Sequence, residues 1–235
     1  MARGLVEVVK IADQKGRFTN FASNGTLFSK EAVEDLLSSR LLSSIAISVD
    51  TPHLEQLDVK ELKKSIKTLT QRLGKKTLPT VTITAMLTRK NLFDGLQEVL
   101  NLARECGVGN VHLHNTSIFE PGLSDYVTPG EKEIAELKIF VAKEFGDLKV
   151  DFSRLDLYFN KKETNFCLAP WTGCFITWEG DVHPCCSHLG EPMGNVFRQG
   201  FREIWNGKKY VAFRKSLLEN DFDPICRACI SDKWH

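Results

Sequence analysis

The chain has 235 residues, of which 42% are hydrophobic, and its 31 Lys and Arg residues nearly balance its 30 Asp and Glu residues. That length accommodates one large domain, or a medium domain together with a small one. A net charge of +1 gives no strong attraction to nucleic acid or anionic lipid, and no apolar run is long enough to span a bilayer. The first residues also lack the apolar stretch and cleavage site of a secretory signal. We therefore expect a cytoplasmic protein with reduced thiols, and neither a membrane nor nucleic acid as its partner.

Helical and strand patterns alternate over the first 160 residues. Ser29 is expected to cap a helix, and Gly74 is expected to end another. In chain order, the expected elements are helices at about 5–12, 30–37, 59–73, 92–106 and 131–145, and extended segments or strands at 17–21, 45–49, 80–87, 110–114 and 149–159.

The β–α units recur at intervals of roughly 30 to 40 residues, which implies parallel strands joined by right-handed crossovers. About five strands are too few for a closed barrel of eight. We therefore expect an α/β fold in which residues 1–160 form an open or partial barrel and residues 161–235 form a small cysteine-rich domain.

Polar residues follow the predicted strands at the positions where parallel α/β folds bind their ligands. Asn24 follows the first strand, Ser48 lies near the end of the second, and Asn115 follows the fourth. Such side chains could hold a polar small molecule. Ser and Asn also build turns and helix caps at strand ends, and on the residues alone this interpretation is favoured.

Six of the seven cysteines gather in the last third of the chain. Cys226-x-x-Cys229 has a spacing that lets two thiolates hold one metal centre from a tight turn, and Cys167 and Cys185 would add two more from a hairpin. The predicted hairpin has strands at 175–178 and 182–184 with a turn at 179–181. Cys174 and Cys186 are alternatives to one of these ligands, and Cys106, at a helix end, is expected to be structural.

Three interpretations of the four thiols compete. A [4Fe–4S] cluster needs four thiolates in a largely apolar pocket. Structural zinc also suits four thiolates, although zinc ribbons pair two Cys-x-x-Cys knuckles and this chain has one. The third interpretation is a set of buried, inert thiols. The residues expected to line an apolar pocket are Trp171, Phe175, Ile176, Trp178, Val196, Phe197, Ile204 and Trp205.

The segment from Cys167 to Cys229 resembles the SPASM and twitch extensions of radical SAM enzymes. The matching residues are Cys167-x-x-Pro170-Trp171, Gly180-Asp181-Val182-x-Pro184-Cys185-Cys186, Gly194-Asn195-Val196, Ile204-Trp205-Asn206-Gly207, Arg214 and Cys226-x-x-Cys229. Upstream, residues 23–27 and 47–50 resemble the later portion of a radical SAM partial barrel. The resemblance covers nearly the whole chain. It implies an auxiliary [4Fe–4S] cluster on Cys167, Cys185, Cys226 and Cys229.

The chain departs from the family in one respect. The motif Cys-x-x-x-Cys-x-x-Cys, which defines the family, is absent, since no three cysteines here have that spacing. The first barrel strands and the Gly-Gly-Glu stretch have no counterpart either. In the family, the three thiolates hold a cluster that reductively splits S-adenosylmethionine, and the resulting 5′-deoxyadenosyl radical abstracts hydrogen from a substrate. We therefore expect the C-terminal part of such an enzyme, from a truncated product, a split gene or a shortened expression form, and no activity from this chain alone.

The family pattern also assigns the cofactor edge of the barrel. Ser48 would lie near the methionyl carboxylate of S-adenosylmethionine, and Asn24, Leu87 and Asn115 would line that cofactor. A basic residue often found after the Ser-x-Asp strand end has no match at 52–58. S-adenosylmethionine is expected to bind only if the missing N-terminal part is supplied, and no residue stands out as a catalytic acid, base or hydrogen donor.

The resemblance also implies partners. These are an N-terminal half supplied in cis or by another chain, a reductant protein such as ferredoxin or flavodoxin, and a peptide or small-molecule substrate. The alternative function is non-catalytic, with four cysteines that hold an iron–sulfur cluster or zinc in a structural or interaction protein.

Overall fold

The computed structural model describes residues 4–49, 58–74, 77–89, 92–115, 129–155 and 167–231. The chain divides into two compact units. The α/β unit comprises residues 1–117 and 122–160, and the cysteine unit comprises residues 118–121 and 161–235. Within the described ranges, no helix is long and apolar enough to cross a membrane.

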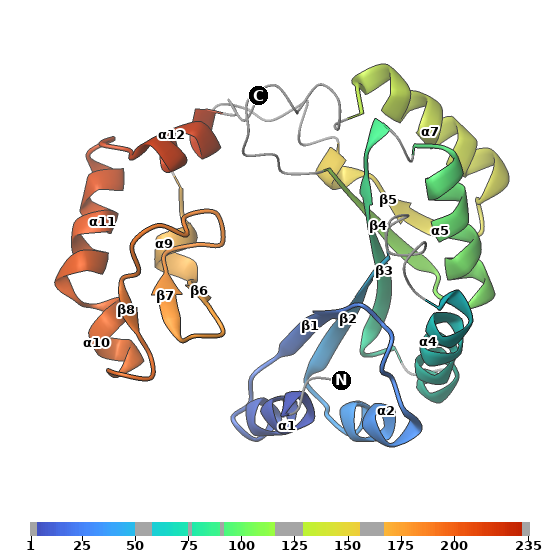
Figure 1. Ribbon diagram of the computed structural model, residues 1–235, viewed down its shortest axis with the longest axis horizontal. Helices are drawn as coiled ribbons and strands as arrows, with labels where there is room; N and C mark the ends of the chain where they lie inside the picture. The colour runs from blue at the N-terminus through green and yellow to red at the C-terminus, as the bar shows by residue number, and fades with distance from the viewer. Residues whose placement is uncertain are drawn as a thin grey trace. The chain divides into compact units, whose positions relative to one another are not determined.

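A five-stranded parallel sheet forms the centre of the α/β unit, with the strands in the order β1-β2-β3-β4-β5 (Figure 1). Each strand therefore lies beside the one that precedes it in the chain, and a helix separates each strand from the next. The strands are β1 (Thr19–Ser23), β2 (Leu42–Ser48), β3 (Thr80–Leu87), β4 (Asn110–Asn115) and β5 (Lys149–Asp151), and the helices are α1 (Leu5–Gln14), α2 (Lys30–Leu37), α4 (Val59–Leu73), α5 (Asp94–Glu105) and α7 (Glu131–Glu144). The expected α/β fold with parallel strands is confirmed, whereas the partial barrel stays a prediction.

The helices begin and end where local chemistry satisfies their free backbone groups. The side chain of Ser29 accepts a hydrogen bond from the Ala32 backbone N–H at 3.2 Å, which confirms the predicted cap of α2. Asp58 caps α4 in the same way, by accepting from the N–H groups of Lys60 and Glu61. Gly74 ends α4 at φ +56°, a conformation that glycine adopts without steric cost.

The core of the α/β unit is formed by the sheet together with buried residues of helices α1, α2, α4, α5 and α7, and α4, α5 and α7 run along one face of the sheet (Figure 1). Ile45 and Ile47 of β2 are fully buried while the residues between and after them are half-buried, as expected for alternate side chains of a strand. Leu62, Ile66 and Leu69 of α4 supply a buried stripe at helical spacing. This packing fixes the sheet, and with it the edge where β1 to β4 end.

The predicted strand at 149–159 is wrong at residues 152–155. The Asp151 carboxylate accepts a hydrogen bond from the Ser153 backbone N–H at 2.8 Å, and residues 153–155 are helical. An aspartate that bonds the backbone two residues ahead favours a turn or a helix start over a continuing strand. Residues 156–159 lie outside the described part of the chain.

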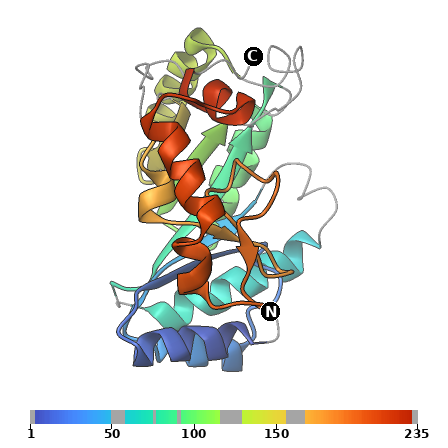
Figure 2. The same ribbon diagram turned by 90° about the vertical axis from the view of Figure 1, so that its left-hand side faces the viewer.

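The cysteine unit contains a small antiparallel sheet in the order β6-β7-β8, with helix α9 before it and three helices after it. Helix α11, in red, runs along the front of the unit in Figure 2. The elements are α9 (Ala169–Thr172), β6 (Phe175–Ile176), β7 (Asp181–His183), β8 (Gly194–Asn195), α10 (Phe201–Trp205), α11 (Lys208–Leu218) and α12 (Pro224–Ser231). The predicted hairpin is confirmed by the pairing of Phe175 with His183 and of Ile176 with Val182.

Gly25, in the turn after β1, is the position of the α/β unit where we expect a small substitution to have a clear cost. Its φ is +76°, and a Cβ atom there would lie 2.7 Å from the Cγ2 atom of Ile47. We expect Gly25→Ala to lower the free energy of unfolding by about 3 kcal/mol, from backbone strain and overpacking together. Urea unfolding followed by circular dichroism measures this.

Gly109→Ala is the matched control for that substitution, because its Cβ would meet no atom within 4 Å and its φ is not positive. We expect it to change the unfolding free energy by less than about 0.5 kcal/mol. Equal unfolding midpoints for the two variants would contradict the prediction.

Candidate metal centre

The six cysteines of the cysteine unit lie on four separate segments. Cys167 precedes α9, and Cys174 lies between α9 and β6. Cys185 and Cys186 follow β7, and Cys226 and Cys229 lie on α12. All six are free thiols; Cys186 is exposed and the others are half-buried.

Helix α12 presents two of these thiols. Asp223 precedes the helix, and its Oδ1 atom accepts hydrogen bonds from the backbone N–H groups of Ile225 and Cys226, at 2.8 and 3.0 Å. Pro224 occupies the first helical position, where its missing N–H costs nothing. Cys226 and Cys229 are three residues apart on this helix, so they share one face. The expected tight turn at these cysteines is therefore wrong, because Asp223 and Pro224 start a helix there.

The thiol of Cys226 lies close to two cysteines from other segments. Burial raises the pKa of Cys226, and the Asp223 carboxylate, Cys185 and Cys167 raise it further. These electrostatic effects require proximity, so thiols from before α9, from after β7 and from α12 are neighbours. A cation bound among them would favour the thiolate forms that the surroundings otherwise oppose. This donor set therefore fits a metal centre.

Tyr210 and Arg214 of α11 hold the segment between Cys167 and Cys174. The Tyr210 hydroxyl donates to the Gly173 carbonyl at 3.3 Å. Arg214 stacks on Tyr210, with 4.2 Å from its guanidinium carbon to the ring centre, and its Nε atom donates to the Pro170 carbonyl at 2.8 Å. Burial raises the pKa of Tyr210 to about 12, with further contributions from the nearby Cys174 and Cys185. Sequence reasoning did not identify Tyr210.

The predicted apolar pocket is only partly present. Trp178 is 88% exposed and Phe197 is 77% exposed, and Phe175 and Ile176 of β6 are also exposed. Trp178 comes just before the turn between β6 and β7, and the ring of Phe197 lies against Gly180 in that turn. The observed cluster consists of buried Val182, Ile204 and Tyr210 with half-buried Cys174, Met193, Val196 and Trp205 around them.

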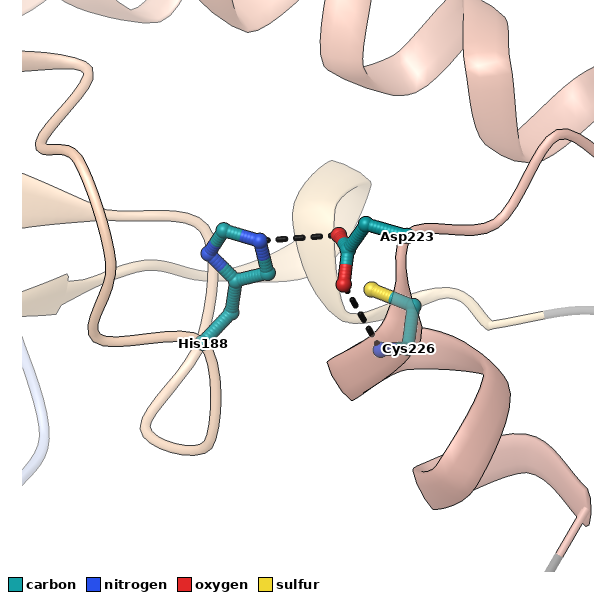
Figure 3. Close-up of side chains that lie close together, drawn as sticks. All are labelled: His188, Asp223 and Cys226. Carbon is teal, nitrogen blue, oxygen red and sulfur yellow. Dashed lines mark hydrogen bonds and ion pairs between the residues drawn. The ribbon is translucent and has the colours of Figure 1, made fainter.

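His188, which sequence reasoning missed, lies beside the candidate ligands (Figure 3). Its Nε2 atom is 2.8 Å from Oδ2 of Asp223, and its backbone N–H donates to the sulfur of Cys185 at 3.3 Å. One ligand atom from each of His188, Asp223 and Cys226 lies within 4.8 Å of the others. The signal in the sequence was a histidine three residues after Cys185, together with an aspartate three residues before Cys226.

The residues predicted to line S-adenosylmethionine lie at the carboxyl ends of neighbouring strands. Ser48, Leu87 and Asn115 end β2, β3 and β4, and Asn24 follows β1 directly. Leu87 is buried, and the side chain of Asn115 lies outside the described part. The Asn24 side chain accepts hydrogen bonds from the N–H and hydroxyl of Thr26, as in the turn-building alternative. Binding of the cofactor here stays a prediction.

Comparison with known proteins gives a family match for the cysteine unit and relatives for most of the chain. Residues 167–230 match the family model SPASM, an iron-sulfur cluster-binding domain. The PqqA peptide cyclase of Gluconobacter oxydans is 27% identical over 246 residues, which cover 97% of this chain and 66% of the relative. The AdoMet-dependent heme synthase of Methanosarcina barkeri is 25% identical over 251 residues, which cover 95% of this chain and 69% of the relative.

The crystal structure of SuiB from Streptococcus suis, bound to the precursor peptide SuiA, has the same fold with a TM-score of 0.60 at 16% identity. The match covers 90% of this chain and 53% of that one. The chain thus spans 66% and 69% of the length of the two curated relatives and about half of SuiB. Residues 167–230 thus match a SPASM iron–sulfur cluster-binding domain, and the relatives support the resemblance of the chain to radical SAM enzymes.

Proposed function

We propose that the chain is the C-terminal portion of a radical SAM enzyme and binds an auxiliary [4Fe–4S] cluster through Cys167, Cys185, Cys226 and Cys229. The observation that supports this proposal is that Cys167 and Cys185, from two other segments, lie near enough to Cys226 to raise its pKa, in a domain that matches the iron–sulfur family. Cys229 lies one helical turn beyond Cys226 on α12 and completes a set of four thiols. Cys174 and Cys186 remain the alternatives.

The spacing of the sulfurs favours a cluster over zinc. Tetrahedral zinc holds each thiolate at about 2.3 Å, so the sulfurs of a four-thiolate zinc site lie about 3.8 Å apart. Among the described residues, the group of three or more metal-binding side chains with ligand atoms within 4.8 Å is His188, Asp223 and Cys226, which holds one thiol. A cluster distributes its four thiolates over four irons and so does not require three sulfurs within 4.8 Å of one another.

A cluster bound there would supply one-electron transfer. The chain's own residues hold and orient the ligands. Asp223 fixes the start of α12, and Arg214 and Tyr210 fix the segment that follows Cys167. In the α/β unit, Asn24, Ser48, Leu87 and Asn115 would line S-adenosylmethionine once an N-terminal part, in cis or on another chain, supplies the Cys-x-x-x-Cys-x-x-Cys ligands. A ferredoxin or flavodoxin would serve as reductant.

The proposed substrate is a peptide or a small molecule. The name of one relative refers to a peptide, and SuiB is bound to a precursor peptide. The heme synthase, and a 2-deoxy-scyllo-inosamine dehydrogenase from Niallia circulans that is 31% identical over 67 residues, have names that refer to small molecules. The latter match covers 27% of each chain.

Anaerobic reconstitution of the 235-residue chain tests cluster binding. With ferrous iron, sulfide and zinc all supplied, we expect about four irons and four sulfides per chain, the content of one [4Fe–4S] cluster. Colourless protein with one zinc per chain and no sulfide would contradict the proposal and favour the non-catalytic alternative.

A second assay separates an enzyme part from a non-catalytic protein. The reconstituted chain is incubated with S-adenosylmethionine and dithionite, alone and with a separately produced segment that carries Cys-x-x-x-Cys-x-x-Cys. We expect 5′-deoxyadenosine from the mixture and none from the chain alone, because the chain lacks those three ligands. Product from the chain alone would overturn the assignment of the missing ligands, and a cluster-loaded chain that never complements would favour the alternative.

A further inference from the structure

A hydrogen-bonded pair connects the two segments that carry Cys185 and Cys226. His188 lies on the loop after β7, three residues beyond Cys185, and Asp223 lies directly before α12. The His188 Nε2 and Asp223 Oδ2 atoms are 2.8 Å apart, although 35 positions separate the residues in sequence. The side chain of His188 is 14% exposed and that of Asp223 is 33% exposed, so solvent only partly screens the pair.

The Asp223 carboxylate uses its two oxygens for two different tasks. Oδ1 accepts from the backbone N–H groups of Ile225 and Cys226 and so starts α12, while Oδ2 faces His188. An aspartate carboxylate is ordinarily ionised at neutral pH and then only accepts hydrogen bonds, so the Nε2 atom of His188 is the donor. The negative charge thus lies beside the sulfur of Cys226 (Figure 3).

His188 contributes a second contact through its backbone. Its N–H donates to the sulfur of Cys185 at 3.3 Å. The ring of His188 meets the ring of Phe213 edge to face, with centres 5.0 Å apart, so α11 also holds the imidazole. Hydrogen bonds to cluster sulfurs and charges near a cluster are two of the factors that set its reduction potential.

We propose that His188 and Asp223 are positioning residues for the cluster and shift its reduction potential in opposite directions. The inference rests on the proposed function, because it takes Cys185 and Cys226 as ligands. Asp223 adds negative charge beside Cys226 and so opposes reduction. His188 favours reduction in two ways: its N–H donates to the Cys185 sulfur, and its ring donates to the Asp223 carboxylate and disperses that charge.

The same three side chains could hold a single divalent metal ion, but two arguments favour the positioning role. Under the proposed function, the sulfur of Cys226 is a ligand of the cluster. The Nδ1 atom of His188 is buried and has no hydrogen-bond partner among the described residues. A metal-bound imidazole almost always donates its other N–H to an acceptor.

A redox titration of the anaerobically reconstituted 235-residue chain, followed by electron paramagnetic resonance, tests the inference. Asp223→Asn keeps a cap oxygen for α12 and removes the charge. We expect it to retain the iron and to raise the ratio of reduced to oxidised cluster about tenfold at a fixed potential, which is 59 mV for a one-electron couple. Asp221→Asn is the matched control, because it removes the charge of an exposed residue two positions earlier. We expect it to change the ratio less than about twofold.

His188 is tested with two variants. His188→Ala is expected to lower the ratio of reduced to oxidised cluster about fivefold, opposite in sign to Asp223→Asn, with part of the iron lost. His188→Gln has an amide that can donate to Asp223. We expect its iron content to equal that of the unsubstituted chain, and its cluster to have a reduction potential closer to that of the unsubstituted chain than to that of His188→Ala. Equal losses of iron from the Ala and Gln variants would show that donation to Asp223 is not what His188 contributes.

The outcomes distinguish the inference from the function on which it rests. If the unsubstituted chain takes up no iron, the proposed function is wrong. If that chain holds a cluster and both Asp223→Asn and His188→Ala titrate like Asp221→Asn, the function stands and the inference is overturned. Shifts of the same sign in the two variants would also overturn it. Asparagine keeps the cap of α12, so Asp223→Asn is expected to hold Cys226 in place and to retain the iron. Loss of iron from this variant would contradict that expectation. Zinc that binds the metal-free chain and is lost on His188→Ala would favour the single-ion site.

Discussion

Replacing Cys226 with serine is expected to reduce the iron content of the reconstituted chain from about four atoms to fewer than one. Cys226 lies near two other proposed ligands, because Cys185 and Cys167 both raise its pKa, and Cys229 follows it on the same helix. A serine hydroxyl loses its proton far less readily than a thiol, and its oxygen is a harder ligand than sulfur. Serine therefore does not replace a soft thiolate ligand of iron. Iron and sulfide analysis, together with the visible absorbance of the protein, measures the loss.

Serine substitutions at other cysteines serve as controls of the same chemistry. Cys106→Ser alters a buried thiol of the α/β unit, and Cys186→Ser alters the exposed neighbour of Cys185. We expect both to keep their iron. Cys174→Ser decides whether this half-buried alternative is a ligand. A brown Cys226→Ser protein with a full complement of iron would contradict the proposed ligand set.

Replacing Arg214 with methionine is expected to lower the free energy of unfolding of the cysteine unit by about 3 kcal/mol. The guanidinium donates to the carbonyl groups of Pro170 and Trp205, at 2.8 and 2.7 Å, and stacks on the rings of Trp205 and Tyr210. Methionine keeps much of the side-chain volume but removes both donors, which leaves two carbonyl groups without those partners. Thermal unfolding of the loaded protein, followed by tryptophan fluorescence, measures the change.

Two further substitutions sharpen this prediction. Arg202→Met removes an exposed arginine from α10, and we expect it to change stability by less than about 0.5 kcal/mol. Arg214→Lys keeps the charge but not the planar fork that reaches two carbonyl groups, so it should be nearly as destabilising as methionine. Full stability in Arg214→Lys would mean that charge, rather than the two-point hydrogen bonding, is what the position requires.

The α/β unit could be predicted well from sequence because its elements are long and periodic. The predicted bounds of β3 and α4 agree with the structure, and Ser29 and Gly74 mark the helix ends as expected. The error came at β5, where the hydrogen bond from Ser153 to Asp151 ends the strand. In the cysteine unit, strand β8 was missed because two residues are too few to show a period.

For the metal centre, the sequence indicates the candidate ligands through their residue type and spacing, but not the contacts that the fold makes around them. Clustered thiols identified the candidate ligands, but no local pattern joins His188 to Asp223, whose contact depends on the folded chain. Exposure is likewise a tertiary property. Trp178 has the large apolar side chain expected of a pocket residue, yet its position beside a turn leaves it in contact with solvent.

The sequential strand order has a consequence for how the protein is made. Each new strand of the α/β unit emerges from the ribosome after its neighbour in the sheet, so pairing can proceed during translation without waiting for distant segments. The proposed ligand cysteines, in contrast, are far apart in the order of synthesis. Cys167 and Cys185 are synthesised well before Cys226 and Cys229, and the donor set is complete only after all eight described strands exist. Under the proposed function, delivery of iron and sulfide would therefore be complete only after the strands of both sheets have been synthesised.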